Sequence, residues 1–405
     1  MTDHSDVLII GGSIAGVRTA EGLRRLSFDG GITILEAGQD LPYDRPALSK
    51  QVLTAGADVE SVMLRSPADL DKARIDLRRG CRASGLDVGA RTVRLTDDTV
   101  IAYSDLVIAT GAAPRELPFA PAGPGVHYLR TVQDAVRLRD AVGAPVRVVV
   151  VGAGFIGSEV AAAAASRAAS VTVVEPFAFP LSRVLGDLVG KRLARLHESK
   201  GVQLLLGRSV SGIEDDGAGG KRVVLDDGTA LSCDVVVVGI GATPNTDWLA
   251  GSGLHVADGV VCDEYCRADA PNVFAAGDVA RWPNPLFTES MRIEHWTNAV
   301  EQAGIVAWNI THPDAPRAYA PVPYVWSDQY GTRLQIVGRP RADDEVRIVL
   351  DDPADDSMVA LYLRDQGVVG AFGLNAPSRI LALRRSLAAR ASLEEIMTAF
   401  DSTLV

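Results

Sequence analysis

The order of apolar and polar positions near the amino end predicts a strand, a tight turn, a helix and a second strand. An apolar run over residues 6–10 is followed by the glycine-rich turn GGSIAG. Apolar residues then recur at helical spacing from Val17 to Leu26, and a second apolar run over residues 32–35 ends at Glu36. Short uninterrupted apolar runs are typical of buried parallel strands, so this stretch predicts a βαβ unit.

The same order returns in the middle of the chain. A strand over residues 146–151 leads into the turn GAGFIG, an alanine-rich helix through Ala165, and a strand over residues 171–174 that ends at Glu175. Each turn is thus followed, roughly 20 positions later, by an acidic residue. Two such units in one chain predict two dinucleotide sites.

Further apolar runs end in short polar turns, and the pattern changes from about residue 321. The earlier apolar runs cover residues 106–109, 235–238 and 273–276. After residue 321, strands with alternating polarity are predicted over residues 334–337, 346–350, 358–363 and 368–372, and a helical stretch closes the chain. Asp216–Gly220 is expected to form the tip of a hairpin. We therefore expect an α/β protein with two Rossmann-like domains and an α+β C-terminal domain.

Composition and charge narrow the function classes. The chain has 405 residues, of which 47% are hydrophobic and 22% charged, as expected for several globular domains. Its net charge of -11 argues against a nucleic-acid partner. No apolar run reaches the roughly 18 residues of a membrane span, and no leader pattern precedes the first strand, so we expect a cytoplasmic protein.

The four cysteines lack the density and spacing of a disulfide framework, a redox dithiol or a metal site. They lie at Cys81, Cys233, Cys262 and Cys266. Only the last two are close in sequence, and three residues separate them. We expect reduced, partly buried thiols and no metal.

The glycines of each turn have distinct tasks: the first permits the bend, the second lets the backbone approach a pyrophosphate, and the third lets the helix pack on the strand. The second unit has all three, at Gly152, Gly154 and Gly157. The first unit has Gly11 and Gly16, but Ser13 holds the middle position. We expect the Ser13 hydroxyl to bind a phosphate.

The two acidic residues predict how the nucleotides are held. Carboxylates at Glu36 and Glu175 are placed to accept hydrogen bonds from a ribose diol. A carboxylate at Glu175 would repel a 2′-phosphate, and the next arginine is Arg183. NADH is therefore favoured over NADPH.

Six further segments resemble those of a known family, the FAD-dependent and NADH-dependent ferredoxin reductases of bacterial oxygenase systems, which include the putidaredoxin reductase type and the reductase components of aromatic-ring dioxygenases. The segments are LPYDRPALSK (41–50), LVIATGAAPR (106–115), GATPNT (241–246), VFAAGDVA (273–280), EHWTNAVEQA (294–303) and YVWSDQYGTRLQIVG (324–338). The resemblance implies a glutathione-reductase-like fold with a discontinuous FAD-binding domain (1–108 and 242–318), an NAD-binding domain (109–241) and a C-terminal domain (319–405).

The resemblance also implies roles for individual residues. Asp278 would hold the FAD ribityl chain, and Trp296 would close over the flavin or its pyrimidine end. Lys50, which follows Arg45 in the same segment, would stand beside the hydride-accepting edge of the flavin and pair with Glu159 near the nicotinamide. For His295 we expect a structural role, because hydride transfer needs no general base. The other implied nucleotide-binding positions are Ile14, Ala15, Ala109, Thr110, Gly111, Arg130, Phe155, Ile156, Gly241 and Glu294.

The route of the electrons follows from a missing thiol. Related flavoproteins relay electrons through cysteine, and some keep one just before a Leu-Pro-Tyr stretch, but Gln39 and Asp40 precede that stretch here. Electrons must then leave from the flavin, which takes two electrons and releases them singly. The family resemblance implies a small [2Fe–2S] ferredoxin as transient acceptor, and we expect a monomer or weak homodimer.

Two other functions share the same nucleotide sites: an NADH dehydrogenase that reduces quinone or another small acceptor, and a flavoprotein whose redox state controls its interactions. The basic amphipathic stretch over residues 379–390 would lie on a membrane in the first of these, although packing on its own domain is commoner. Trp326, with Arg292, Arg333 and Arg339, is a candidate docking patch for an acidic ferredoxin; solvated arginines and a packed tryptophan are the alternative.

Overall fold

The computed structural model describes residues 3–54, 57–120 and 122–402, which divide into two compact units. The first unit comprises Met1–Asp44, Val62–Ala113 and Thr243–Pro323, and the second comprises Arg45–Ser61, Pro114–Ala242 and Tyr324–Val405. Each unit contains one of the two predicted βαβ segments. The three domain boundaries expected from the sequence stay a prediction.

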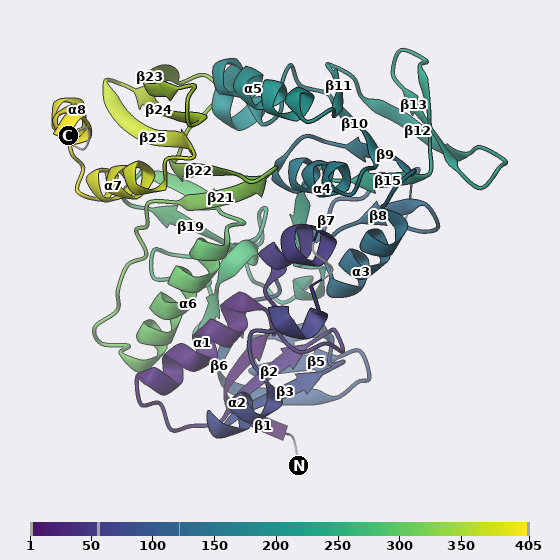
Figure 1. The fold of residues 1–405 in the computed structure, drawn as a ribbon. Coiled ribbons are helices and arrows are strands. Elements are labelled where there is room, and N and C mark those ends of the chain that lie inside the picture. The colour runs from purple at the N-terminus through teal and green to yellow at the C-terminus, as the bar shows by residue number, and fades with distance from the viewer. Residues whose placement is uncertain (1–2, 55–56, 121, 403–405) are drawn as a thin grey trace. The chain divides into compact units, whose positions relative to one another are not determined.

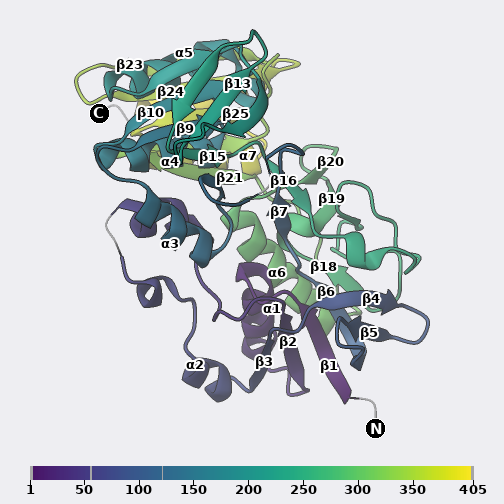
Figure 2. The same cartoon turned by 90° about the vertical axis from the view of Figure 1, so that its right-hand side faces the viewer.

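The first unit is built on a seven-stranded sheet of order β3-β2-β1-β6-β5-β4, in which β18 also pairs with β6. The pairings of β1 with β2 and β6, and of β2 with β3, are parallel, whereas β4, β5 and β6 pair antiparallel, with β4 at the edge (Figure 2). The elements of this part of the chain are β1 (Asp3–Ile10), α1 (Ile14–Arg25), β2 (Ile32–Glu36), α2 (Pro67–Lys72), β3 (Ile75–Arg79), β4 (Ala83–Asp87), β5 (Thr92–Leu95), β6 (Val100–Ile108), β7 (Ala112–Pro114), β16 (Ala242–Pro244), β17 (Val260–Val261), β18 (Val273–Ala275), β19 (Ala280–Asn284), β20 (Glu289–Arg292) and α6 (Trp296–Thr311).

The core of this unit explains why its strands are continuous apolar runs. Val7, Leu8 and Ile9 have no exposed surface, since both faces of the central strand are covered. Helices α1 and α6 lie side by side (Figure 1). At Gly22 of α1, an added Cβ would lie 2.8 Å from the Cβ of Ala307, so only glycine permits this close helix packing.

The second unit contains a five-stranded parallel sheet of order β11-β10-β9-β15-β8 and an antiparallel sheet of order β12-β13-β14. Residues 216–220 lie at the turn between β12 and β13, which confirms the expected hairpin. The elements are η1 (Arg45–Ala47), η2 (Leu48–Val52), β8 (Val126–Tyr128), α3 (Val132–Ala141), β9 (Arg147–Val151), α4 (Phe155–Ser166), β10 (Ser170–Glu175), α5 (Ser182–Ser199), β11 (Gln203–Leu206), β12 (Val210–Asp215), β13 (Lys221–Leu225), β14 (Ala230–Cys233) and β15 (Val235–Val238).

The carboxyl end of the chain adds an antiparallel sheet of order β21-β22-β25-β24-β23 to the second unit. Its elements are β21 (Tyr324–Gln329), β22 (Thr332–Gly338), β23 (Glu345–Asp352), β24 (Ser357–Arg364), β25 (Gly367–Leu374), α7 (Pro377–Ala388) and α8 (Leu393–Ser402). Helix α7 packs on β22 and β25 with Ile380, Leu383 and Leu387 buried. This packing contradicts the alternative in which the apolar face of residues 379–390 lies on a membrane.

The predicted fold class is confirmed. The predicted strands are present, and most extend by a few residues at one or both ends: the first begins at Asp3 rather than Asp6. Strand β21 was not predicted, although it carries the WSDQ motif. Within the described residues, no helix is both long and apolar enough to cross a membrane.

Candidate functional site

The first glycine-rich turn is shaped by backbone that approaches too closely for a side chain. A Cβ added to Gly11 would lie 2.2 Å from the carbonyl oxygen of Ala109. A Cβ added to Gly16 would lie 1.9 Å from the carbonyl oxygen of Gly11. Ser13 is the N-cap residue of α1, and its side chain makes no capping hydrogen bond. Ile14 and Ala15 begin the helix. The turn therefore fits a dinucleotide pyrophosphate at a helix N-terminus, where backbone N–H groups favour anions.

The second turn has the same geometry and a glycine at every position. A Cβ added to Gly152 would lie 2.5 Å from the carbonyl oxygen of Gly239. A Cβ added to Gly157 would lie 2.0 Å from the carbonyl oxygen of Gly152. At Gly154 it would meet no atom within 4 Å. The middle glycine thus faces open space just before Phe155 and Ile156 begin α4, as a close approach by a pyrophosphate requires.

Each predicted ribose-binding glutamate bonds to the backbone of its own glycine turn. Glu36 accepts hydrogen bonds from the amides of Gly12 (2.7 Å) and Gly38 (2.8 Å). Glu175, which is 6% exposed, accepts them from Ala153 (2.6 Å) and Phe177 (3.1 Å). A carboxylate oxygen has a second lone pair, so both remain able to accept from a ribose hydroxyl.

Two of the family-like segments interlock in the first unit. The Thr110 hydroxyl donates to the carbonyl of Asn245, and the Asn245 amide donates back to the carbonyl of Thr110, both at 2.8 Å. The backbone amide of Asn245 also donates to Gly111, whose φ of +67° favours glycine. Sequence reasoning missed Asn245 as a residue that holds this loop. In the second unit, Gly241 accepts from the amide of Arg115 at 2.9 Å.

Trp296 is oriented by an aspartate that sequence reasoning also missed. Its indole Nε1 donates to Oδ1 of Asp44, 2.7 Å away, within the first unit. Asp44 belongs to the LPYDRP segment, which was the available signal. His295 occupies the N-cap position of α6, and Trp296 is the first residue of that helix.

Asp278 lies on a short helical turn held from two sides. Gly277 before it has a φ of +79° and donates its amide to Gln302, while the backbone carbonyl of Asp278 accepts from Arg292. Arg292 also pairs with Glu294 at 2.6 Å. These contacts fix the backbone at the end of β18, where the predicted ribityl-binding aspartate lies.

The structure brings together the expected pair of Lys50 and Glu159 in the second unit. The Lys50 ammonium lies 2.9 Å from Oε1 of Glu159, which is 4% exposed. Glu159 also accepts from the hydroxyls of Ser49 and Ser327. Lys50 lies on the π-helical turn η2, and such turns are frequent at functional sites. The expected contact of Lys50 with the flavin stays a prediction.

Arg45 and Arg130 also belong to the second unit. Arg45 begins η1, and Arg130 precedes α3 and donates its backbone amide to Asp134 at 3.1 Å. Their expected roles in nucleotide binding stay predictions.

The cysteines of the described residues are free thiols, and the two most closely spaced are buried. Burial raises the pKa of Cys266 to about 12 and that of Cys262 well above its usual value. Both remain protonated at neutral pH, so neither supplies a thiolate for electron relay.

One arginine of the expected docking patch is not a surface group. The Arg292 side chain is 11% exposed and pairs with Asp258 and Glu294, which contradicts its expected role in docking. Arg333 is 51% exposed but pairs with Asp328 at 2.8 Å. The backbone amide of Arg339 donates to Val369. The expected docking roles of Arg333 and Arg339 stay predictions.

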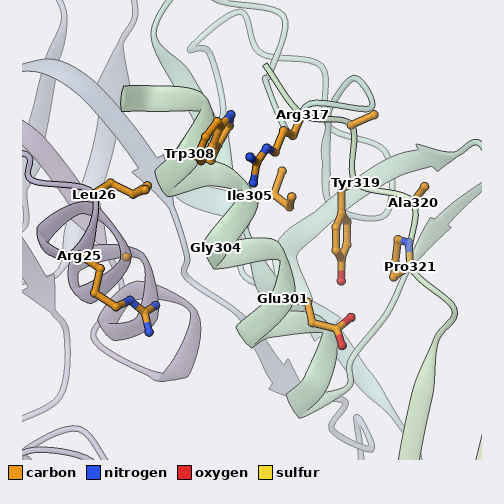
Figure 3. Close-up of a pocket in the computed structure, with 12 residues that line it drawn as sticks. Arg25, Leu26, Glu301, Gly304, Ile305, Trp308, Arg317, Tyr319, Ala320 and Pro321 are labelled. Atoms are coloured by element: carbon orange, nitrogen blue, oxygen red, sulfur yellow. The ribbon is translucent and has the colours of Figure 1, made fainter. Parts of the chain in front are cut away.

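A groove of about 600 Å³ in the first unit is lined by none of the predicted site residues. Three parts of the chain line the groove: the end of α1, helix α6, and the segment that follows α6. Figure 3 shows Trp308 and Arg317 at one end of it. The Arg317 guanidinium lies 3.3 Å from the centre of the Trp308 ring. The residues predicted to bind FAD and NADH thus lie outside this groove.

Comparison with known proteins assigns the family. Residues 5–303 match the family model described as pyridine nucleotide-disulphide oxidoreductase, and residues 324–403 match the one described as reductase C-terminal. The chain is 40% identical to the ferredoxin–NAD⁺ reductase component of the anthranilate 1,2-dioxygenase system of Burkholderia cepacia, over 95% of this chain and 94% of the relative. It is a member of the ferredoxin–NAD⁺ reductase family.

Other relatives of this reductase agree. It is 37% identical to rhodocoxin reductase of Rhodococcus erythropolis, over 94% of this chain and 89% of the relative. Its structure matches that of the covalent putidaredoxin reductase–putidaredoxin complex with a TM-score of 0.90 at 33% identity, covering 96% of this chain and 93% of that chain. The predicted family, enzyme class and cofactors are confirmed: this is an oxidoreductase that uses FAD and NAD(H).

Proposed function

We propose that this reductase oxidises NADH, passes the hydride to FAD, and delivers the electrons singly to a [2Fe–2S] ferredoxin that serves an oxygenase. Two glycine-rich turns with paired glutamates support two dinucleotide sites. Gln39 and Asp40 before the Leu-Pro-Tyr stretch, together with the buried Cys262 and Cys266, support electron exit without a thiol relay. One relative is the ferredoxin–NAD⁺ reductase component of a dioxygenase system, and one matched structure is a complex of putidaredoxin reductase with putidaredoxin.

The residues divide into two proposed binding sets and one pair. When bound, FAD takes up a hydride and releases electrons one at a time. The first set holds FAD and comprises Gly11, Ser13, Ile14, Ala15, Gly16, Glu36, Arg45, Lys50, Ala109, Thr110, Gly111, Arg130, Asp278, Glu294, His295 and Trp296. The second holds NADH and comprises Gly152, Gly154, Phe155, Ile156, Gly157, Glu159, Glu175 and Gly241. Lys50 and Glu159 form the catalytic pair.

The Lys50–Glu159 pair would orient the nicotinamide end of NADH. Glu159 lies in the first turns of α4, which begins at the glycine-rich turn, so a pyrophosphate held there places the rest of the dinucleotide along this end of the helix. A buried ion pair with further hydrogen bonds keeps one geometry, and geometry decides the rate when reacting atoms must align.

The test is NADH-driven reduction of cytochrome c by the purified FAD-loaded enzyme, with and without candidate [2Fe–2S] ferredoxins. We expect the rate to depend strongly on one ferredoxin. Equal rates without any ferredoxin would contradict the proposal. Activity with a quinone alone would favour the dehydrogenase function, and slow turnover with every acceptor would favour a redox-controlled interaction module. We propose a cytoplasmic location, which fractionation of cells would test.

A further inference from the structure

Three segments of the second unit that are far apart in sequence meet at the carboxylate of Glu159. Oε1 of Glu159 lies 2.9 Å from the Lys50 ammonium and 2.7 Å from the Ser327 hydroxyl, and Oε2 accepts from Ser49. Ser49 and Lys50 come from η2, Glu159 from α4, and Ser327 from β21, which lies beside α4 (Figure 1). One carboxylate thus joins the nucleotide-binding helix to the C-terminal sheet.

The hydrogen bonds around Ser327 have one direction. Gln329 donates its side-chain amide to Oγ of Ser327 at 3.1 Å, so the Ser327 hydroxyl uses its own hydrogen toward Glu159. Ser327 has no exposed surface and Gln329 is 1% exposed, so water does not compete for these bonds. The chain from Gln329 through Ser327 to Glu159 is therefore a fixed relay of donors.

We propose that Ser327 and Gln329 are positioning residues for hydride transfer, which hold the Glu159 carboxylate and through it the Lys50 ammonium. A lysine side chain is a point charge on a flexible stem, and its place is set by its partner. Without the Ser327 bond, the Glu159 carboxylate is no longer anchored to β21, so it holds Lys50 and Ser49 of η2 less firmly. This inference rests on the proposed function, because the effect is expected on reduction by NADH.

The first experiment compares Ser327→Ala with wild type as FAD-loaded enzyme, mixed rapidly with NADH in the absence of oxygen. We expect the limiting rate of flavin reduction to fall about tenfold, which corresponds to about 1.4 kcal/mol. The dissociation constant of NADH should change less than about twofold, because the turn at Gly154 and Glu175 is untouched. An unchanged limiting rate would overturn the proposal.

Ser357→Ala is the matched control. Ser357 is also a buried serine of the C-terminal sheet, 5% exposed, but it lies on β24, which β22 and β25 separate from β21. We expect its limiting rate to equal that of wild type. A loss equal to that of Ser327→Ala would mean that any buried hydroxyl of this sheet matters, and would overturn a specific role for Ser327.

A double-mutant cycle tests whether Ser327 acts through the Glu159 carboxylate or through a general loss of stability. If Ser327 acts through the Glu159 carboxylate, Ser327→Ala should cause less than about a twofold further loss in the Glu159→Gln background. A full tenfold loss in that background would contradict the proposal. Gln329→Leu removes the hydrogen-bond donor to Ser327 but leaves the Ser327 hydroxyl in place. We expect the limiting rate of flavin reduction to fall about threefold in this variant. A limiting rate equal to that of wild type would exclude a role for Gln329.

A second readout does not depend on turnover. Hydrogen exchange of the backbone amides over residues 48–53 should speed up about tenfold in Ser327→Ala and remain at the wild-type rate in Ser357→Ala, since Glu159 holds η2. Unchanged exchange in Ser327→Ala would overturn the inference. Failure of NADH to reduce the wild-type flavin would instead contradict the proposed function, with the exchange experiment still deciding whether Ser327 holds η2.

Discussion

At the scale of single residues, three glutamates share one arrangement. Both carboxylate oxygens of Glu36, Glu159 and Glu175 accept hydrogen bonds from groups of the same unit. Their side chains are therefore held in place independently of any ligand. Preorganised acceptors lose less entropy on binding than flexible ones, which favours nucleotide affinity.

Replacement of Glu175 tests the nicotinamide preference. Glu175→Ala leaves the amides of Ala153 and Phe177 without their carboxylate and removes a ribose acceptor. Hydrogen bonds to charged groups contribute about 1.5–3 kcal/mol, so kcat/KM for NADH should fall about 10- to 100-fold. The value for NADPH should fall less, because repulsion of its 2′-phosphate is also removed. Steady-state kinetics with both cofactors check this, and an unchanged ratio between them would contradict it.

His197 makes stability depend on pH. Burial lowers the pKa of His197 to about 4, whereas that of a histidine in an unfolded chain is about 6.5. Between these values the unfolded chain binds a proton that the folded chain does not. The stability that neutral His197 contributes is thus complete above pH 6.5 and is lost, by about 3 kcal/mol in total, as the pH falls to 4.

The change to test this is His197→Leu. Its free energy of unfolding should fall less steeply between pH 6.5 and 4 than that of wild type, although the variant should be less stable at neutral pH because Nδ1 of His197 lies 2.7 Å from the Tyr330 hydroxyl. Urea unfolding at a series of pH values measures both. Parallel curves for the two proteins would contradict the assignment.

At the scale of elements, the second βαβ turn separates the requirements of folding from those of binding. Gly157→Ala would place a Cβ 2.0 Å from the carbonyl oxygen of Gly152, so we expect a stability loss of about 1–3 kcal/mol or more. In Gly154→Ala the added Cβ meets no atom within 4 Å, and the φ of -74° at this position is one that alanine adopts. This variant should therefore fold as wild type but bind NADH more weakly. Thermal unfolding and NADH titration distinguish them; equal effects of both variants on stability would be the contrary result.

At the scale of the whole molecule, a net charge of -11 must be reconciled with the proposed docking of an acidic ferredoxin. Local positive groups can still steer association, and salt screens them with a Debye length of about 10 Å at 0.1 M. Arg333→Glu should lower the ferredoxin-dependent rate about tenfold and weaken its dependence on salt, while NADH oxidation with a small inorganic acceptor stays unchanged. The control is Arg347→Glu on β23, where a comparably exposed arginine also pairs with a neighbouring acid. If the two reversals lower the ferredoxin-dependent rate equally, Arg333 has no specific role.

The fold class, the two nucleotide turns and the missing thiol could be predicted from the sequence, because they depend on neighbouring residues: apolar runs, glycine spacing and the residues before Leu41. Which side chains meet could be seen only in the folded chain. Asp44 with Trp296, Asn245 with Thr110, and Ser327 with Glu159 lie more than 100 positions apart, and no local pattern encodes such pairs. The tertiary structure also showed that Arg292 is used in ion pairs, since burial depends on how distant segments pack.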